Sequence, residues 1–237
     1  MGTPIIQQRR GKGSPTYRAP SHRYFGEIKY VAVVGKAIRG EVLDIVNSVG
    51  HSAPLMLIKY EDGRNALLPA PTGIRKGEDV WLGDGARQKL GSTLRLDEIP
   101  SGTFIFNIEK KPFDGGQLVR TSGTTAQIIG KEEGKIIVRM PSKRTIAFDP
   151  NCRATIGIVA GGGRTEKPFI KAGKHHIARK ARGKLHPHVC GVAMNAKDHP
   201  FGGTHRRTKG RPTTTSRHAP PGRKVGLIAA KKTGRGK

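Results

Sequence analysis

The uneven distribution of charge along this chain is the feature that most constrains its fold. The 237 residues carry a formal net charge of +27. Residues 1–26 hold five basic and no acidic residues, and residues 161–237 hold 20 basic and two acidic ones. Residues 27–160 are nearly balanced, with 19 basic and 15 acidic residues. The sequence therefore predicts a globular middle region between two strongly basic arms.

The excess positive charge indicates a polyanionic partner, because self-repulsion disfavours a compact state until counter-charges neutralise it. Nucleic acid and an acidic membrane surface are the candidates. No run of about 18 apolar residues predicts a transmembrane helix, and the first residues lack the apolar core of a signal peptide. The two cysteines, Cys152 and Cys190, exclude a disulfide framework and suit a reducing compartment. We expect a cytoplasmic protein that binds nucleic acid, with no membrane partner and no small-molecule substrate.

Short β-type runs bounded by turn residues fill the middle region. The predicted β-type runs are residues 28–34, 38–46, 55–60, 64–70, 78–85, 93–99, 103–109, 118–121, 125–130, 135–140, 144–149 and 153–160. Glu61-Asp62-Gly63 and Glu132-Glu133-Gly134 each mark a hairpin. Helical spacing is absent, and short, closely spaced strands are typical of small barrels. We predict an all-β fold of two tandem barrels with irregular extensions: residues 1–27 (extension), 28–92 and 93–160 (barrels), and 161–237 (extension).

The N-terminal arm interleaves cations with aromatic rings. The candidate RNA-binding cations are Arg9, Arg10, Arg18 and Arg23, and the rings are Tyr17, His22, Tyr24 and Phe25. Guanidinium groups pair with phosphates, and flat rings stack on unpaired bases. The Pro and Gly content predicts neither helix nor strand here. A solvated tail is the alternative, but the aromatic content favours an arm that RNA orders.

The C-terminal arm begins at Gly161-Gly162-Gly163, which we interpret as a flexible joint, and holds too little apolar material for a core. Residues 173–184 could form a short helical turn. Because ordering a residue costs about 1–2 kcal/mol, we expect both arms to be disordered without RNA. Asn195 and His199 are candidates for base or shape recognition, since phosphate binding alone favours Lys or Arg. The full set of candidate contacts is Lys174, His175, Arg179, Lys180, Arg182, Asn195, His199, Arg206, Arg207, Arg211 and Arg217.

Two chemical alternatives centre on histidines of this arm. Asp198 and His199 could be an acid–base pair, but neighbours in an extended chain point to opposite sides, and Pro200 favours extended geometry. The run from His186 to Cys190 offers two histidines and one cysteine for zinc, whereas a structural site needs four ligands. We therefore predict no catalytic residue, no metal site and no enzymatic activity of the protein alone.

Three long motifs identify a family resemblance. They are GKGSPTYRAPSHR at residues 11–23, PSGTFIFNIEKKPFDGGQLVRTSGT at residues 100–124, and GVAMNAKDHPFGGTHR at residues 191–206. In these stretches the chain resembles the ribosomal protein L2 (uL2) family of the large subunit, in its archaeal and eukaryotic form. The resemblance extends over nearly the whole sequence.

The resemblance implies an OB-fold barrel followed by an SH3-like barrel. It also implies extensions that bind large-subunit rRNA near the peptidyl-transferase region, where magnesium could bridge protein and RNA without being a cofactor. Neighbouring ribosomal proteins and the small subunit would be further partners, with roles in subunit association and tRNA binding. His199 matches the histidine of the family's D-H-P-x-G-G motif, and Phe201 stands where bacterial members have a second histidine. Direct acid–base action of His199 in peptidyl transfer, or a free-standing RNA chaperone or translation regulator, are the alternatives.

Overall fold

The structure of this chain is a computed structural model that describes residues 6–32, 35, 37–203 and 213–231. The chain forms two compact units. We call residues 21–168 the β unit, and the described residues up to Pro20 and from Phe169 onward the arm unit. The predicted domain limits at residues 27, 92 and 160 stay a prediction.

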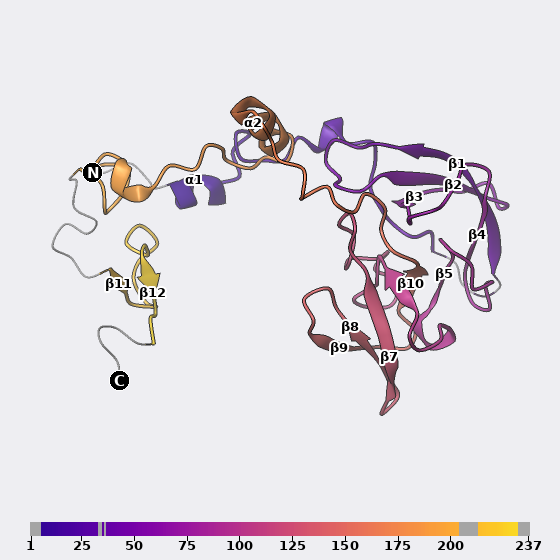
Figure 1. Cartoon of the computed structure of the whole chain (residues 1–237). Coiled ribbons are helices and arrows are strands. Elements are labelled where there is room, and N and C mark those ends of the chain that lie inside the picture. Colours follow the sequence, from indigo (N-terminus) through magenta and orange to yellow (C-terminus); the bar gives the residue numbers. More distant parts are fainter. Residues whose placement is uncertain (1–5, 33–34, 36, 204–212, 232–237) are drawn as a thin grey trace. The chain divides into compact units, whose positions relative to one another are not determined.

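The β unit contains ten strands in one continuous order, β3-β2-β1-β4-β5-β10-β6-β7-β8-β9 (Figure 1). The strands are β1 (Ile38–Val46), β2 (Leu55–Tyr60), β3 (Asn65–Pro69), β4 (Asp79–Leu82), β5 (Thr93–Arg95), β6 (Phe104–Phe106), β7 (Ala126–Glu132), β8 (Lys135–Arg139), β9 (Thr145–Phe148) and β10 (Arg153–Ile156). Neighbours pair antiparallel except β4 and β5, which pair in parallel. The predicted all-β, barrel-type fold is confirmed.

Two main clusters of buried side chains support these strands. The first gathers residues of β1 to β4, including Val42, Ile58 and Leu82. The second gathers residues of β5 to β10, including Ile105 and Val138. Burying such a side chain stabilises a fold by about 1.5–3 kcal/mol. The β unit therefore has the apolar core that the balanced charge of the middle region predicts.

Both predicted hairpins form. β2 pairs with β3 across a turn in which Gly63 has a φ of 82° and donates from its N–H to the carbonyl of Tyr60. β7 pairs with β8 across Glu133 and Gly134, with φ values of 47° and 73°. Two successive positive φ values are typical of the two-residue turn that matches strand twist.

Three sequence-based expectations are wrong in the β unit. Residues 28–32 run beside the core without joining a strand, and residues 118–121 make only an isolated bridge from Leu118 to Ile108. The run predicted as a strand at 93–99 divides into β5 and a 3-10 helix, η2 (Leu96–Glu98). In each case the apolar side chains pack into the core, but the backbone does not form the regular hydrogen bonds of a β-ladder over the whole run.

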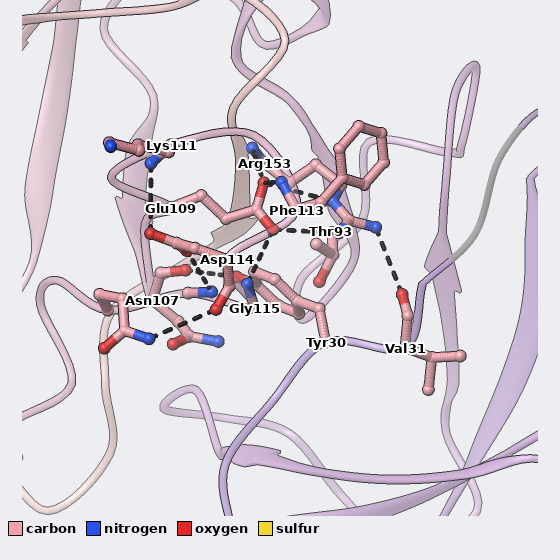
Figure 2. Close-up of polar contacts among 12 residues, drawn as sticks. Tyr30, Val31, Thr93, Asn107, Glu109, Lys111, Phe113, Asp114, Gly115 and Arg153 are labelled. Carbon is pink, nitrogen blue, oxygen red and sulfur yellow. Dashed lines mark hydrogen bonds and ion pairs between the residues drawn. The ribbon is translucent and has the colours of Figure 1, made fainter.

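A buried ion pair joins the loop after β6 to β10 (Figure 2). Glu109 is 0% exposed and Arg153 is 4% exposed, and Nη2 of Arg153 lies 3.0 Å from Oε1 of Glu109. The backbone N–H groups of Arg153, Phe113 and Gly115 also donate to this carboxylate. The Arg153 guanidinium lies 5.6 Å from the Tyr30 ring centroid and 5.1 Å from that of Phe113. Buried charges persist only when paired and hydrogen-bonded in this way.

The same network fixes the loop from Lys110 to Gln117. Asp114 accepts hydrogen bonds from the N–H groups of Lys110 and Lys111 through Oδ2 and from Gly116 through Oδ1. The hydroxyl of Tyr30 donates to the carbonyl of Asn107 at 2.5 Å, and burial raises the pKa of this phenol. The loop is consequently held through its backbone N–H groups by two carboxylates, the partly exposed one of Asp114 and the buried one of Glu109.

The arm unit consists of short elements. They are α1 (Ile6–Gly11), α2 (Ala172–Lys180), the 3-10 helix η3 (Gly191–Ala193) and the parallel pair β11 (Thr214–Thr215) and β12 (Leu227–Ile228). The helical turn predicted at 173–184 is confirmed by α2. The expectation of no helix in the N-terminal arm is wrong, since α1 and η1 (Ser21–Arg23, in the β unit) form there. No helix among the described residues is long and apolar enough to cross a membrane.

Candidate nucleic-acid interface

The arm unit has almost no core. Of its described residues, Gly202 and Val225 are the two that are buried. α2 contains no buried residue and no acidic residue in its first turn, and its last turn ends on Arg179 and Lys180. Its fold therefore leaves a dense set of cations in contact with solvent.

The candidate cations of the N-terminal arm lie at the ends of short elements. Arg9 and Arg10 occupy the last turn of α1 and are exposed. Arg18 is exposed and ends a turn in which its N–H donates to the carbonyl of Ser14. Arg23 is the last residue of η1 and is exposed, but it belongs to the β unit.

The candidate residues around α2 differ in burial. Lys174, Arg179 and Lys180 are exposed, whereas His175 and Arg182 are half-buried. Arg217, in the segment after β11, is exposed. Arg206, Arg207 and Arg211 lie outside the described residues, so the predictions made for them stay predictions.

Four rings gather at α2, and the sequence named only His175 among them as a candidate RNA contact. The ring of His175 stacks on Phe169 with centroids 4.9 Å apart, and it lies 4.2 Å from the ring of His186. The centroids of His176 and His186 lie 6.0 Å apart. The crowding of histidines between residues 175 and 188 was the sequence signal for this cluster, but their spacing did not reveal which rings meet.

Burial and neighbouring groups disfavour a charge on His186, in the middle of this ring cluster. Nε of Arg179 donates to Nε2 of His175 at 3.1 Å, so that nitrogen is an acceptor. Desolvation, followed by His175, His176 and Arg179, lowers the pKa of His186. Aromatic rings beside exposed cations resemble the combination that single-stranded RNA meets in stacking sites.

The loop from Gly191 to Gly203 folds around His199. The N–H groups of Asp198 and His199 both donate to the carbonyl of Asn195, which makes residues 195–199 a turn. The expectation that Asp198 is extended is therefore wrong. Nδ1 of His199 accepts from the N–H of Phe201 at 3.1 Å, so the neutral ring carries its proton on Nε2. Burial lowers the pKa of His199.

Glycine is required where this loop closes. A Cβ on Gly191 would lie 2.4 Å from Cε1 of His199, and a Cβ on Gly202 would lie 2.3 Å from the carbonyl oxygen of Asn195. His199 is thus wedged against backbone on one side and faces the Phe201 ring, 5.3 Å away, on another. Asn195 itself is exposed.

The structure brings residues of the two arms together, although about 150 residues separate them in sequence. A cavity of about 370 Å³ is lined by Arg10, Tyr17 and Arg179, among others. A smaller one, about 70 Å³, is lined by Ile6, Arg10 and His199 together with residues 185–198 in part. Arg10, a candidate of the N-terminal arm, therefore lines both cavities together with candidates of the C-terminal arm. The spacing of these residues in the sequence did not predict this.

The metal alternative finds no support among the described residues, which contain no cluster of three or more His, Cys, Asp or Glu arranged to hold an ion. His186 packs against other histidine rings, and Cys190 is exposed.

Comparison with known proteins decides the family. Residues 89–220 match the model described as "Ribosomal Proteins L2, C-terminal domain". The protein named large ribosomal subunit protein uL2 of Methanothermobacter thermautotrophicus is 52% identical over 239 residues, covering 99% of both chains. The chain belongs to the uL2 family. Proteins of the same name from Methanococcoides burtonii and Haloarcula marismortui are 51% and 50% identical and are covered over 100% and 99% of their lengths.

Membership of the uL2 family confirms the resemblance drawn from the three motifs, including its archaeal type. It makes the chain a structural constituent of the large ribosomal subunit, and its location is the ribosome of the cytoplasm. The arm unit and its candidate RNA contacts are therefore part of a ribosomal protein.

Proposed function

We propose that this uL2 chain is a primary rRNA-binding protein whose two arms enter large-subunit rRNA while the β unit acts as a rigid platform. In this proposal it stabilises rRNA near the peptidyl-transferase region and supports subunit association and tRNA binding. Neighbouring ribosomal proteins and the small subunit are its further partners. These finer roles rest on the family resemblance, and the physical case concerns RNA binding.

The observation that carries the proposal is the arm unit's shortage of buried residues beside its surplus of cations. Two buried residues among those described cannot offset the self-repulsion of this unit, in which residues 169–237 hold 18 basic residues and one acidic residue, a net charge of +17. A polyanion can, because each neutralised phosphate releases condensed counterions. A large folded RNA supplies phosphates at the density that such an arm needs.

The candidate residues divide by chemistry. Lys174, Arg179 and Lys180 are exposed point or forked donors suited to phosphates. His199 offers a neutral Nε2–H donor from a loop that glycines let approach another surface closely. We assign phosphate contacts to the α2 cations and a shape-specific contact to His199 and Asn195.

Retention in the ribosome tests the proposal most directly. Large subunits containing the full chain are washed in rising salt and sedimented, and the chain is quantified in the pellet. Stoichiometric retention through a high-salt wash is expected. Complete release at moderate salt would indicate a transient factor, such as an RNA chaperone or a translation regulator, and would contradict the proposal.

Hydrogen exchange tests whether RNA orders the arms. In the free chain, amides of α2 and of the loop from Gly191 to Gly203 should exchange close to the unprotected rate, because few buried contacts hold them. Amides of β2 and β8 should be protected by the global free energy of unfolding. Arms that are as protected as the β unit without RNA would contradict the idea that RNA supplies their order.

The acid–base alternative for His199 gains nothing from the geometry. Burial lowers the pKa of this imidazole, which makes it a weaker base near neutral pH. His199→Ala in assembled ribosomes separates the two roles when assembly and single-turnover peptide transfer are measured independently. We expect a defect in assembly, or little effect. Normal assembly with a collapse of the transfer rate would instead favour catalysis.

A further inference from the structure

A cavity of about 580 Å³ opens in the β unit, and its lining includes Tyr24, a ring of the N-terminal arm. Three segments line it: residues 21–29, residues 50–55 and residues 114–121, each in part. Its volume falls within the roughly 300–1,000 Å³ of sites that take small organic groups. We propose that this cavity binds one unpaired nucleotide of rRNA, with its base inside and its phosphate at the mouth.

Aromatic rings form one wall. Tyr24 and His51 both line the cavity, with ring centroids 5.8 Å apart at 63°. The rings are held in place, since Oγ of Ser48 contacts Nδ1 of His51 at 2.8 Å and accepts from the N–H of Phe25 at 3.2 Å. A fixed aromatic wall is the feature that stacks an unpaired base, whatever its identity.

A glycine sets the position of this wall. A Cβ on Gly50 would lie 2.4–2.5 Å from three atoms of the Tyr24 ring. Any larger residue would therefore push the ring out of place. A substitution at Gly50 therefore displaces the Tyr24 ring without removing it.

Charge around the cavity distinguishes the base from the phosphate. Glu27, Asp114 and Arg120 line it, but Nε and Nη2 of Arg120 already donate to Asn107 and Ile28, so a phosphate held deep inside would meet carboxylates. Lys29 is exposed, and its stem lies against Gly115, where a Cβ would be 2.4 Å from Cγ of Lys29. The acidic residues and Gln117 can instead pair with the donor and acceptor edge of a base, leaving the phosphate to Lys29.

The floor of the cavity is rigid. Arg120 donates through Nε to Oδ1 of Asn107 at 2.9 Å and through Nη2 to the carbonyl of Ile28. Asp114 is fixed by the loop described above (Figure 2). A site whose polar groups are already positioned loses little freedom when a ligand enters.

Free nucleotides and rRNA share this chemistry, and the structure favours rRNA. Lys29 offers a single exposed ammonium, which is too little to hold a free nucleotide's phosphate strongly. A nucleotide within rRNA is delivered by the binding of the whole chain, so the inference rests on the proposed function.

The test uses large subunits assembled with the full-length chain. Tyr24→Ala removes the ring and Gly50→Ala displaces it, while Tyr24→Phe keeps it. Gly130→Ala is the matched control, because a Cβ there meets nothing within 4 Å. Base reactivity of the rRNA is mapped with dimethyl sulfate and carbodiimide. Losing one stacked ring weakens the contact roughly 5- to 150-fold.

We expect the same nucleotide, or short run, to become at least about fivefold more reactive in Tyr24→Ala and Gly50→Ala and to stay protected in Tyr24→Phe and Gly130→Ala. Unchanged reactivity in both ring variants, with the chain retained in the subunit, would overturn the nucleotide site alone. Loss of retention of the unaltered chain in high salt would instead overturn the proposed function.

A second measurement avoids dependence on how the variants fold. Gln117, which lines the cavity and is exposed, is replaced by p-azidophenylalanine and irradiated in assembled subunits. A crosslink to the nucleotide found by chemical mapping supports the inference, and a crosslink to a ribosomal protein, or none, overturns it. Equilibrium dialysis of the free chain against AMP and GMP should show no saturation below millimolar concentration. Micromolar saturation would make a free nucleotide the ligand and overturn the rRNA assignment.

Discussion

Arginine has opposite roles in the two units of this protein. In the β unit, Arg153 is 4% exposed and lies against the carboxylate of Glu109. In the arm unit, Arg179 and Arg217 are exposed, and residues 161–237 contain only two acidic residues. The first unit neutralises its buried charge internally, and the second leaves neutralisation to a partner. Stability and RNA affinity should therefore respond to different substitutions.

The largest effect is expected from Glu109→Ala. Removing this carboxylate leaves the guanidinium of Arg153 buried and unpaired, which should lower the free energy of unfolding by about 3–5 kcal/mol. Urea unfolding followed by the fluorescence of Trp81 measures the change. The double change Glu109→Leu with Arg153→Met should recover only part of the loss. It removes the unpaired charge, but the N–H groups of Phe113, Gly115 and residue 153 lose their acceptor. A loss below about 1 kcal/mol for the single variant would break the comparison.

A triple substitution tests the opposite unit. Lys174→Ala, Arg179→Ala and Lys180→Ala together should change unfolding of the β unit by less than about 0.5 kcal/mol. The slope of log affinity against log salt for rRNA should fall by about two to three. Lys131→Ala, Lys135→Ala and Arg139→Ala, all exposed on β7 and β8, are the matched control. An equal decrease of the salt slope in both triple variants would show that cations of the β unit contribute to rRNA binding as much as those of the arm unit.

Mild acid should act on the histidines of the arm unit. Burial lowers the pKa of His199, and burial followed by the neighbouring His175, His176 and Arg179 lowers that of His186. A histidine whose pKa is lower in the folded state stabilises that state at pH values above its unfolded pKa, which is about 6.5. This stabilisation is lost as the pH falls through the pKa of the folded state. Ring NMR signals of the chain in complex with rRNA should therefore report loss of the cluster around His186 between pH 7 and pH 5. His186→Phe keeps a ring but does not titrate, so pH dependence that persists in this variant would contradict the assignment.

The smallest effect is expected at the surface of the β unit. Nη2 of Arg39 lies 3.0 Å from Oδ1 of Asp79, but the side chains are 50% and 36% exposed. Asp79→Asn should cost no more than about 1 kcal/mol, because water screens such a pair. A larger loss than that of Glu109→Ala would show that burial does not rank the ion pairs of this unit.

Local chemistry made much of the fold predictable. Glu61-Asp62-Gly63 predicted the first hairpin because Gly63 takes a positive φ that other residues resist. The segment from Ile28 to Ala32 misled because its apolar residues belong to a core segment outside any ladder: Tyr30 donates through its N–H to Gly115 and through its hydroxyl to Asn107. Period and residue type do not report such long-range partners.

The site was predictable in composition but not in assembly. Exposed cations such as Lys174 and Arg179 were predicted as RNA contacts from residue type alone, and those contacts stay predictions. That Arg10 lines a cavity with Arg179 and another with His199 could not be predicted, because no local pattern links residues so distant in sequence. The same holds for Tyr24 and Arg120, which line one cavity from different segments.

The pairing of α1 with the segment around Leu185 has a consequence for synthesis. A ribosome that adds about 5–20 residues per second needs on the order of ten to thirty seconds to reach that partner after making Arg10. Throughout that interval a nascent basic arm emerges without its protein contacts, beside a machine built largely of RNA. The β unit is contiguous in sequence and can fold during this time. The nascent chain therefore passes through a state in which the β unit is folded while the cationic N-terminal arm has no protein partner.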